Sequence, residues 1–424
     1  MVYKTNRMDG HVWAYLWDWQ VIPCTLAVVA GPLITMAYRL TRTPDAGEGS
    51  FSLAQALRGI LCLMMFASLL RAGCLYLLEH PLIRPLTYLS VFAVLTSFLS
   101  PYPYENIVFA VRLAFAALVF ANAFHLADRS FCDIRWPIAC AWFVLILMSI
   151  SQALGLIMGN TVAAYQSEYA TAGVIDQAAI TSAYIISTLP VFLMFFPNGS
   201  HAVLAVVLLL VSLFFTMRRT DLIAAVVTVL FIVIGNLKPW RRVRHGKMVC
   251  ALCLLAIITL AGLRSAPGAD LVSRFKDLDP SQGTGSGRYI IWRVALDHMA
   301  ERPLGEQALG EGMGSIRDVI DRHFGSALGG HNDWLDITFS FGVVGLMALG
   351  WWYLTLARFT IALYRIRHPV LQGVFSSLVI LFLMSAGSGG VFDPSFAMVY
   401  AALGFWAAMV PFRGPHEYAG CASY

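Results

Sequence analysis

The sequence has 424 residues, of which 58% are hydrophobic and only 12% are charged. This composition excludes an ordinary soluble protein and predicts a polytopic membrane protein with no large soluble domain. A formal net charge of +5 can indicate a nucleic-acid partner, but here Lys and Arg concentrate in short loops at one side of the predicted membrane. We therefore expect residues 1–424 to form one integral membrane domain that binds no nucleic acid.

The chain begins with a segment that we expect to be cytoplasmic and uncleaved, because Lys4 and Arg7 are not followed by a compact apolar core and a cleavage site. Apolar stretches long enough for membrane helices then follow, mostly with short connections. They lie near 19–38, 52–70, 85–100, 106–126, 137–159, 178–197, 201–216, 222–237, 248–263, 333–356, 369–386 and 394–412. The predicted fold class is all-α, with about twelve transmembrane helices and both termini cytoplasmic.

One long hydrophilic connection, residues 264–331, interrupts this series. Counting the spans from a cytoplasmic N-terminus places this loop on the outer face of the membrane. The same count places the basic connections "KPWRRVRHGK" and "ADRSFCDIRW" on the inner face, as the positive-inside rule expects. Polar chemistry on the outer side is therefore expected in loop 264–331 and in the short outer connections.

Four arginines lie near the outer face, where short loops are usually poor in basic residues. Arg218 and Arg219 occupy the connection "TMRRTD", while Arg58 and Arg112 lie about two turns inside predicted spans. One interpretation is that they are interfacial side chains reaching lipid headgroups. Because a buried arginine costs about 3 kcal/mol on insertion scales, we expect each to have a partner. Together they indicate a site for a phosphate or pyrophosphate headgroup.

The long outer loop contains the glycine-rich stretch "GTGSG", after which residues 288–300 have the apolar spacing of a helix. The apolar positions are Ile290, Ile291, Val294 and Leu296. A glycine-rich turn that opens a helix offers backbone N–H groups to an oxyanion, and Arg288 stands at the helix start. A flexible hinge is the alternative interpretation. A dinucleotide-binding fingerprint is excluded, because no strand–helix–strand unit surrounds these glycines.

The sequence predicts no metal site. None of the eight cysteines shows metal-ligand spacing. Asp277 and Asp279 are similar to the Asp-x-Asp pair by which many glycosyltransferases hold a divalent metal. Lys276 beside them and Pro280 after them favour a solvated turn instead. We therefore expect neither a metal nor another cofactor.

His331 stands at the start of the apolar segment "HNDWLDITFSFGVVG", directly after the small-residue stretch "GSALGG". At the outer membrane boundary, its imidazole would titrate near neutral pH, which suits a general base. Asn332 and Asp336 are near enough in sequence to orient this ring or an acceptor. His298 and His323 lie in the same loop and are competing candidates.

Spacing distinguishes His331 from the other two histidines. His331-Asn332 is followed, after nine residues, by Gly342-Val343-Val344-Gly345. This order resembles the His-Asn-x9-Gly-x-x-Gly signature of the O-antigen ligase family.

Three further elements carry the same resemblance, which covers most of the chain and is concentrated from about Val203 to Gly345. Arg219-Thr220 resembles the family's arginine at the outer end of a span, although Arg218 stands where the family often has Ser. Gly287, Arg288 and Trp292 resemble its Gly-Arg-x-x-x-Trp element. The Pro-x-Gly and Gly-x-Gly turns follow in "RPLGEQALGEGMG", where a few extra residues separate them.

The resemblance implies a metal-independent, multi-span glycosyltransferase of GT-C-like architecture in the bacterial inner membrane, with its active site facing the periplasm. Such enzymes move a glycan from undecaprenyl pyrophosphate to a sugar hydroxyl of lipid A-core, among membrane lipids. Carried over to this sequence, the expected catalytic residues are His331 as general base, with Arg288 and Arg219 on the pyrophosphate. The residues expected to bind substrate are Arg218, Arg58, Arg112, Asn332 and Tyr289.

Three alternatives remain open. An O-antigen polymerase uses the same donor and the same His and Arg chemistry with a different acceptor. Oligosaccharyltransferases acting on protein usually carry a larger soluble C-terminal part, whereas this sequence stops at Tyr424, soon after the last predicted span. A transporter of lipid-linked glycans is the non-enzyme alternative, and the lack of a two-half repeat disfavours it.

Overall fold

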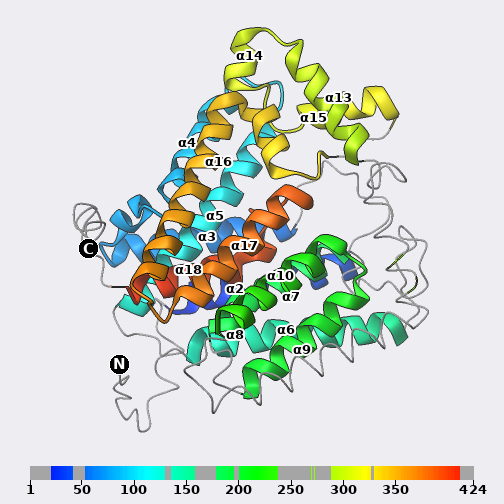
Figure 1. Ribbon diagram of the computed structural model, residues 1–424. Coiled ribbons are helices and arrows are strands. Elements are labelled where there is room, and N and C mark those ends of the chain that lie inside the picture. Colours follow the sequence, from blue (N-terminus) through cyan, green and yellow to red (C-terminus); the bar gives the residue numbers. More distant parts are fainter. Residues whose placement is uncertain are drawn as a thin grey trace.

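The computed structural model describes residues 21–41, 53–128, 135–157, 178–194, 200–236, 288–325 and 329–410, together with residues 269 and 272. Every regular element within these ranges is a helix (Figure 1). The predicted span near 248–263, the Asp277–Asp279 pair and the "GTGSG" stretch lie outside the described residues.

The helices follow the predicted spans closely along the chain. In the first part they are α2 (Val21–Thr41), α3 (Leu53–Arg71), the short 3-10 helix η1 (Leu75–Glu79), α4 (Arg84–Ser97), α5 (Pro103–Asp128), α6 (Arg135–Ile157), α7 (Ala178–Ser187), α8 (Leu189–Met194), α9 (Ser200–Phe215) and α10 (Arg219–Asn236). The later ones are α13 (Arg288–Ala300), α14 (Leu304–Leu309), α15 (Ser315–Phe324), α16 (Asp333–Arg365), α17 (Leu371–Gly387), the 3-10 helix η5 (Pro394–Phe396) and α18 (Ala397–Ala408).

Three of the described helices, α5, α6 and α16, are long and apolar enough to cross a membrane. Shorter apolar helices cover 178–194, 201–215, 371–387 and 394–408. The single span predicted near 178–197 is divided into α7 and α8, with Pro190 in the first turn of α8. Because proline has no backbone N–H to continue a helical ladder, a break before it is expected. The number of spans and the sidedness stay predictions.

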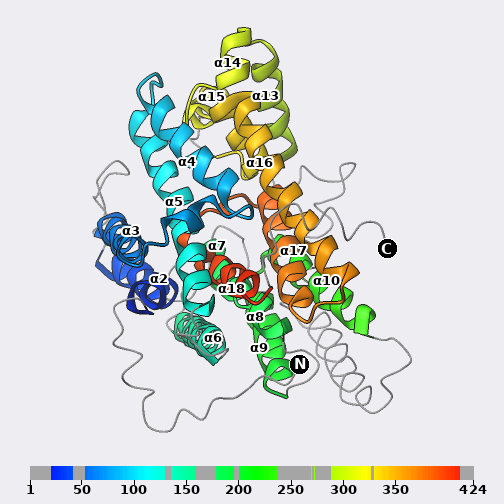
Figure 2. The same cartoon turned by 90° about the vertical axis from the view of Figure 1, so that its left-hand side faces the viewer.

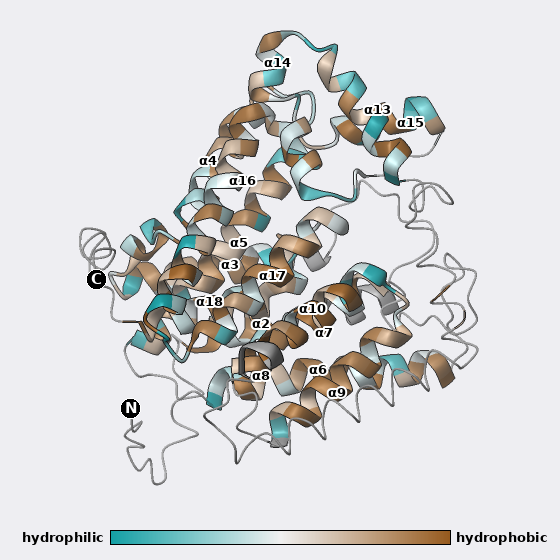
Figure 3. Ribbon diagram, viewed as in Figure 1, coloured by the Kyte–Doolittle hydropathy of each residue, from teal (hydrophilic) through white to brown (hydrophobic). Residues whose placement is uncertain are grey.

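The polar loop forms its own small layer at one end of the bundle. Helices α13, α14 and α15 gather at the end where α16 begins and α4 meets α5 (Figures 1 and 2). These three helices contain more hydrophilic residues than the helices below them (Figure 3). The end of the α4–α5 hairpin holds this layer: the Ser100 hydroxyl donates to the Glu311 carbonyl at 2.9 Å, and the Met313 N–H donates to the Asn106 amide oxygen at 2.6 Å.

A second, small hydrophobic core joins this layer to α16. Ile291 and Ala295 of α13 pack with Ile316 and Ile320 of α15 and with Phe339 of α16. The helix predicted over 288–300 is confirmed as α13. The expected apolar face is only partly right, since Ile290 and Leu296 are 45% and 54% exposed. The contact with α15 and α16 selects the i, i+4 pair Ile291 and Ala295 as the inward positions.

A kink at Gly342 fixes where the polar layer meets α16. Gly342 has φ 62° and ψ −158°, which interrupts the helical hydrogen bonds. The Gly312 N–H donates to the Ser340 carbonyl at 2.8 Å, and the Arg302 guanidinium donates to the Phe339 carbonyl at 3.1 Å. A side chain at Gly342 would collide with the backbone of Ala308 at the end of α14. The kink therefore provides both the free carbonyls and the space that α14 and its following turn need.

Replacing Gly342 with Ala should detach α14 from α16 and lower stability, because positive φ costs about 1–3 kcal/mol for a residue with a side chain and Ala308 has no room to move. Hydrogen exchange of residues 302–312 should rise strongly in the G342A variant. Gly350→Ala is the matched control on the same helix, since nothing lies within 4 Å of its added Cβ. Equal exchange in the two variants would contradict this account of the kink.

Candidate functional site

The residues singled out by the sequence converge on one connection, Gly387–Val391, between α17 and η5. The Arg288 guanidinium donates to the Gly387 carbonyl, and the Arg218 guanidinium donates to the Ser388 hydroxyl at 2.9 Å. Backbone N–H groups of Gly390 and Val391 donate to the Asp333 carboxylate at 2.5 and 3.1 Å. The connection thus links the starts of α10, α13 and α16, which lie far apart in the sequence at Arg219, Arg288 and Asp333.

Three helix N-termini therefore face the same region. α10 begins at Arg219, α13 at Arg288 and α16 at Asp333. The N-terminal end of a helix carries partial positive charge and backbone N–H groups without intrahelical partners. The dipoles add to the charge of the arginines, so this region favours an anion over a cation.

His331 lies at the rim of this region in an unusual backbone conformation. Its φ is +53°, in the left-handed region that residues with a side chain seldom occupy. Gly389, with φ +69°, packs against it so closely that an added Cβ would lie 3.2 Å from the His331 carbonyl carbon. Strained backbone of this kind persists where the surrounding contacts impose it, and it is frequent at functional sites.

Hydrogen bonds on both sides of His331 impose that conformation. The Trp292 indole N–H donates to the Gly330 carbonyl at 2.8 Å, and the Gly330 N–H donates to the Asp336 carboxylate at 3.0 Å. Asn332 caps α16, because its amide oxygen accepts from the Trp334 and Leu335 N–H groups at 2.9 and 3.2 Å. We call the contacts of Trp292 and Asp336 with Gly330 the Gly330 clamp. They give the Gly-Arg-x-x-x-Trp element a physical role, since α13 carries both Arg288 and the Trp292 side of the clamp.

Asn332 was expected to bind substrate, and in the structure its side-chain amide makes hydrogen bonds within the chain. Besides the cap, its amide nitrogen donates to the Ala386 carbonyl at 3.0 Å. Both ends of the amide therefore have partners within the protein. A positioning role for Asn332, holding the start of α16 against the end of α17, agrees with these contacts.

Removing the indole N–H of the Gly330 clamp with Trp292→Phe should reduce kcat about tenfold and leave the fold intact, because the ring keeps its packing while the hydrogen bond to Gly330 is lost. Steady-state kinetics of the variant check this. Trp334→Phe is the matched control, because Gly330 is held by Trp292 and Asp336 and not by the indole of Trp334. A W292F variant with unchanged kcat would show that the clamp does not position His331 for the reaction.

The two arginines before α10 have different surroundings. Arg218 lies 3.3 Å from the buried Asp221 carboxylate and also donates to the Ser182 hydroxyl at 3.4 Å. With its contact to Ser388, this guanidinium ties α7, α10 and the Gly387–Val391 connection together. Arg219 is only 9% exposed at the first position of α10, and Thr220 beside it packs against Gly387. The sequence did not predict Ser182 or Asp221, because their role depends on helices brought together only by folding.

Arg112 and Arg58 lie differently with respect to this site. The charge of Arg112, on α5, acts on the Asp333 carboxylate at the start of α16. Arg58 lies on α3, and no hydrogen bond or ion pair joins it to another residue that the structure describes. Their expected contact with substrate stays a prediction.

The remaining candidates lie on α13 and α15. Tyr289 is 39% exposed and its ring meets that of Trp292 edge-on, with centroids 5.9 Å apart. His298 stacks on Phe339, and His323 contacts Phe324. Both histidines line a cleft between α13 and α15, whereas His331 lies beside the Gly387–Val391 connection. The fold therefore places His331, and not its two competitors, next to the arginines.

The pKa of His331 is lowered. The surrounding protein desolvates the imidazole, although the residue keeps an exposed face, and the charges of Arg288, Arg218 and Arg317 lower its pKa further. A lowered pKa keeps the ring neutral at neutral pH, and a neutral imidazole can accept a proton.

Arg302 is a structurally important residue that the sequence reasoning missed. It is 6% exposed, pairs with the Glu311 carboxylate at 2.9 Å and lies over the Phe339 ring at 3.7 Å. Together with its bond to the Phe339 carbonyl, these contacts fasten the polar layer to α16. Arg302 directly precedes the Pro-x-Gly turn. In a loop with many charged residues, this position is the only feature of the sequence that could have pointed to its structural role.

In the part of the chain that the structure describes, no group of three or more His, Cys, Asp or Glu residues is arranged to hold a metal ion. The charged groups gathered at the Gly387–Val391 connection are Arg288, Arg218 with the Asp221 carboxylate beside it, and the Asp333 carboxylate, which backbone N–H groups hold. Such a site is suited to an anionic ligand.

The fold and the site define the class of this protein. The described residues form helices, several of them of the apolar membrane type, and arginines gather at one end of the bundle beside a histidine whose pKa is lowered. Residues 204–350 match the family model described as O-Antigen ligase, so this part of the chain is similar to the O-antigen ligase family. The matched range contains Arg218, Arg219, Arg288 and His331. No curated protein matches the chain.

Proposed function

We propose that this protein is an O-antigen ligase of the bacterial inner membrane. It would transfer a glycan from undecaprenyl pyrophosphate to a sugar hydroxyl of lipid A-core at the periplasmic face. The family supports a ligase or polymerase that acts on lipid-linked glycans. The observation that carries the proposal is the position of His331, held by the Gly330 clamp within electrostatic reach of Arg288 and Arg218.

The proposed mechanism is a single displacement. Neutral His331 takes the proton of the acceptor hydroxyl, and the hydroxyl oxygen forms a bond to the anomeric carbon of the glycan. The bond between that carbon and the pyrophosphate oxygen breaks, and undecaprenyl pyrophosphate leaves with the electron pair. Arg288 and Arg219 neutralise the charge that develops on this leaving group, as a metal ion does in other glycosyltransferases. The helix N-termini of α10 and α13 add to the same effect.

The proposal that the site faces the periplasm rests on which connections between helices lie close together. Counting spans places residues 101–105, 216–221, 264–331 and 387–393 on the outer face. In the structure, the Tyr102 hydroxyl donates to the Asp318 carboxylate, and Arg288 and Arg218 reach the Gly387–Val391 connection. Four connections expected on one face therefore lie at one end of the bundle, which supports a site open to the periplasm.

The rate of transfer should fall at acidic pH, because His331 must be neutral to act as a base. Since its pKa is lowered, the midpoint of this fall should lie below about pH 6.5, the ordinary histidine value. Arg317→Gln removes a charge that lowers this pKa, so the fall should begin at higher pH. Rate profiles of both proteins measure the effect, with Arg293→Gln as the control. A profile that R317Q does not move upward would contradict the assignment of His331 as the titrating base.

The function is tested with purified protein, an undecaprenyl-pyrophosphate glycan and excess EDTA. One reaction receives lipid A-core, and another receives only a second molecule of lipid-linked glycan. Glycan on lipid A-core supports the ligase. Lengthened lipid-linked glycan supports the polymerase, and movement of the lipid across vesicles without bond formation supports a transporter. Loss of transfer in EDTA with recovery in Mg²⁺ would overturn the metal-independent mechanism.

A further inference from the structure

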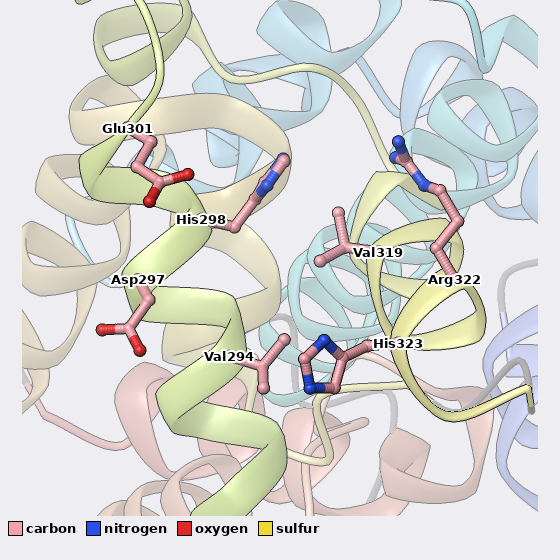
Figure 4. A pocket seen from close by; sticks show the side chains of 7 residues that line it. All are labelled: Val294, Asp297, His298, Glu301, Val319, Arg322 and His323. Atoms are coloured by element: carbon pink, nitrogen blue, oxygen red, sulfur yellow. The ribbon is translucent and has the colours of Figure 1, made fainter.

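An open cleft lies between α13 and α15, away from the Gly387–Val391 connection, with a volume of about 310 Å³. From α13 and the residue after it, the cleft is lined by Val294, Asp297, His298 and Glu301; from α15, by Val319, Arg322 and His323. Figure 4 shows Val294 and His298 facing Val319 and His323 across the gap, with Glu301 and Arg322 toward its upper edge.

The cleft lies along the same helix that carries Arg288. Val294 is six residues and His298 ten residues beyond Arg288, which corresponds to about 9 Å and 15 Å along the axis of α13. A ligand in the cleft would therefore begin several ångströms from the proposed reaction centre. That separation suits a part of an extended substrate that lies beyond its reacting end.

The chemistry of the lining suits sugar hydroxyls. Imidazoles, a guanidinium and carboxylates supply hydrogen-bond donors and acceptors of both kinds. The two valines form an apolar patch between them, which can pack against the C–H face of a sugar ring. Charges of both signs disfavour a strongly anionic ligand, and a lining that offers polar and apolar surface in similar amounts suits a sugar, which has both kinds of surface. A volume near the lower end for small-ligand sites leaves room for a short stretch of a glycan.

We propose that the α13–α15 cleft binds carbohydrate: a segment of the acceptor or of the donor glycan that adjoins the reacting sugar. This inference rests on the proposed function, because it assigns the cleft to a substrate of that reaction. His298 and His323 then have a role in holding sugar, and neither acts as the base. The cleft would contribute to the choice of substrate without touching the bond that is made.

Direct binding tests the proposal without relying on transfer. Full-length protein carrying His331→Ala, which prevents turnover, is titrated with two soluble probes: lipid-free core oligosaccharide and the lipid-free glycan of the donor. The double variant Glu301→Ala, His323→Ala removes hydrogen-bonding groups at exposed positions, and Val294→Phe fills the cleft with bulk. Asp321→Asn, an exposed position of α15 outside the lining, is the matched control.

One probe should bind about tenfold more weakly to both cleft variants than to the control, because the double variant loses hydrogen-bonding groups and V294F occupies the space of the sugar. Weaker binding of the core oligosaccharide identifies an acceptor subsite, and weaker binding of the donor glycan identifies a donor subsite. Unchanged binding of both probes, or binding of neither, overturns the proposal. Because binding is measured without turnover, a protein that transfers no glycan but binds sugar in the cleft would refute the proposed function alone.

Discussion

Replacing His331 with Ala should abolish detectable glycan transfer while the protein still folds and still binds the lipid-linked donor. A positioned general base contributes about 10²- to 10⁴-fold to a rate, and no other histidine described by the structure lies beside Arg288 and Arg218. Folding should survive because His331 is exposed and precedes α16, whose cap is made by Asn332. Alanine keeps the β-carbon, so the substitution does not relieve the left-handed backbone conformation of residue 331.

The measurement compares initial rates of H331A and wild-type protein, with donor binding determined separately. His201→Ala is the matched control, because His201 is an exposed histidine on α9 and should retain wild-type rates. Donor affinity should be nearly unchanged in H331A, because the arginines carry it. Transfer by H331A at a substantial fraction of the wild-type rate would reduce His331 to a residue at a helix entrance, and His298 or His323 would be examined next.

Replacing Arg288 with Lys should reduce transfer at least about a hundredfold. An ammonium can still reach the Gly387 carbonyl, so the connection between α13 and α17 is retained. It cannot reproduce the planar fork that grips two phosphate oxygens at once, so stabilisation of the leaving group is lost. Arg219→Lys should show a large loss for the same reason. The effect should appear in kcat more than in KM, because charge on the pyrophosphate develops as the bond breaks.

Arg293→Lys is the matched control for these variants, since this side chain lies on the same helix with 84% of its surface exposed. Its transfer rate should equal that of the wild type. If both Arg288→Lys and Arg219→Lys ligate at near-normal rates and normal protein levels, neither arginine binds the pyrophosphate.

Helix positions could be predicted well because apolar stretches are a local property of the sequence. The helix over 288–300 is confirmed as α13, and the start of the segment after His331 coincides with α16. Local pattern does not determine which face of a short helix is buried. Ile290 and Leu296 were expected on the apolar face of α13 and are exposed, because the neighbouring α15 and α16 contact Ile291 and Ala295 instead.

The candidate site could be predicted in part, through residues that carry distinctive chemistry in a distinctive order. His331, Arg288 and Arg218 do lie together. The connection that joins them, "GSGG" at 387–390, contains only small residues that bind through backbone groups and the Ser388 hydroxyl, and such a role leaves no pattern in a single sequence. The same holds for Gly330, which is held by Trp292 and Asp336 through its backbone. Arg302 was missed because its partner Phe339 lies on a different helix.

The kink in α16 shows how a known signature acquires a physical meaning only in three dimensions. Gly342, the first glycine of the Gly-x-x-Gly pair, lies against the end of α14 and opens α16, so that the turn after α14 can reach the Phe339 and Ser340 carbonyls. The signature therefore couples the histidine to the docking of the polar layer.

The stereochemistry of the new glycosidic bond tests the central claim most directly. If His331 deprotonates the acceptor and the arginines stabilise the departing pyrophosphate in one displacement, the anomeric configuration of the transferred sugar must be opposite to that in the donor. NMR of the isolated product, with the donor as reference, measures both configurations. Inversion is the result predicted for this site. Retention would require a covalent glycosyl intermediate or an equivalent two-step route, and would contradict the roles given to His331, Arg288 and Arg219.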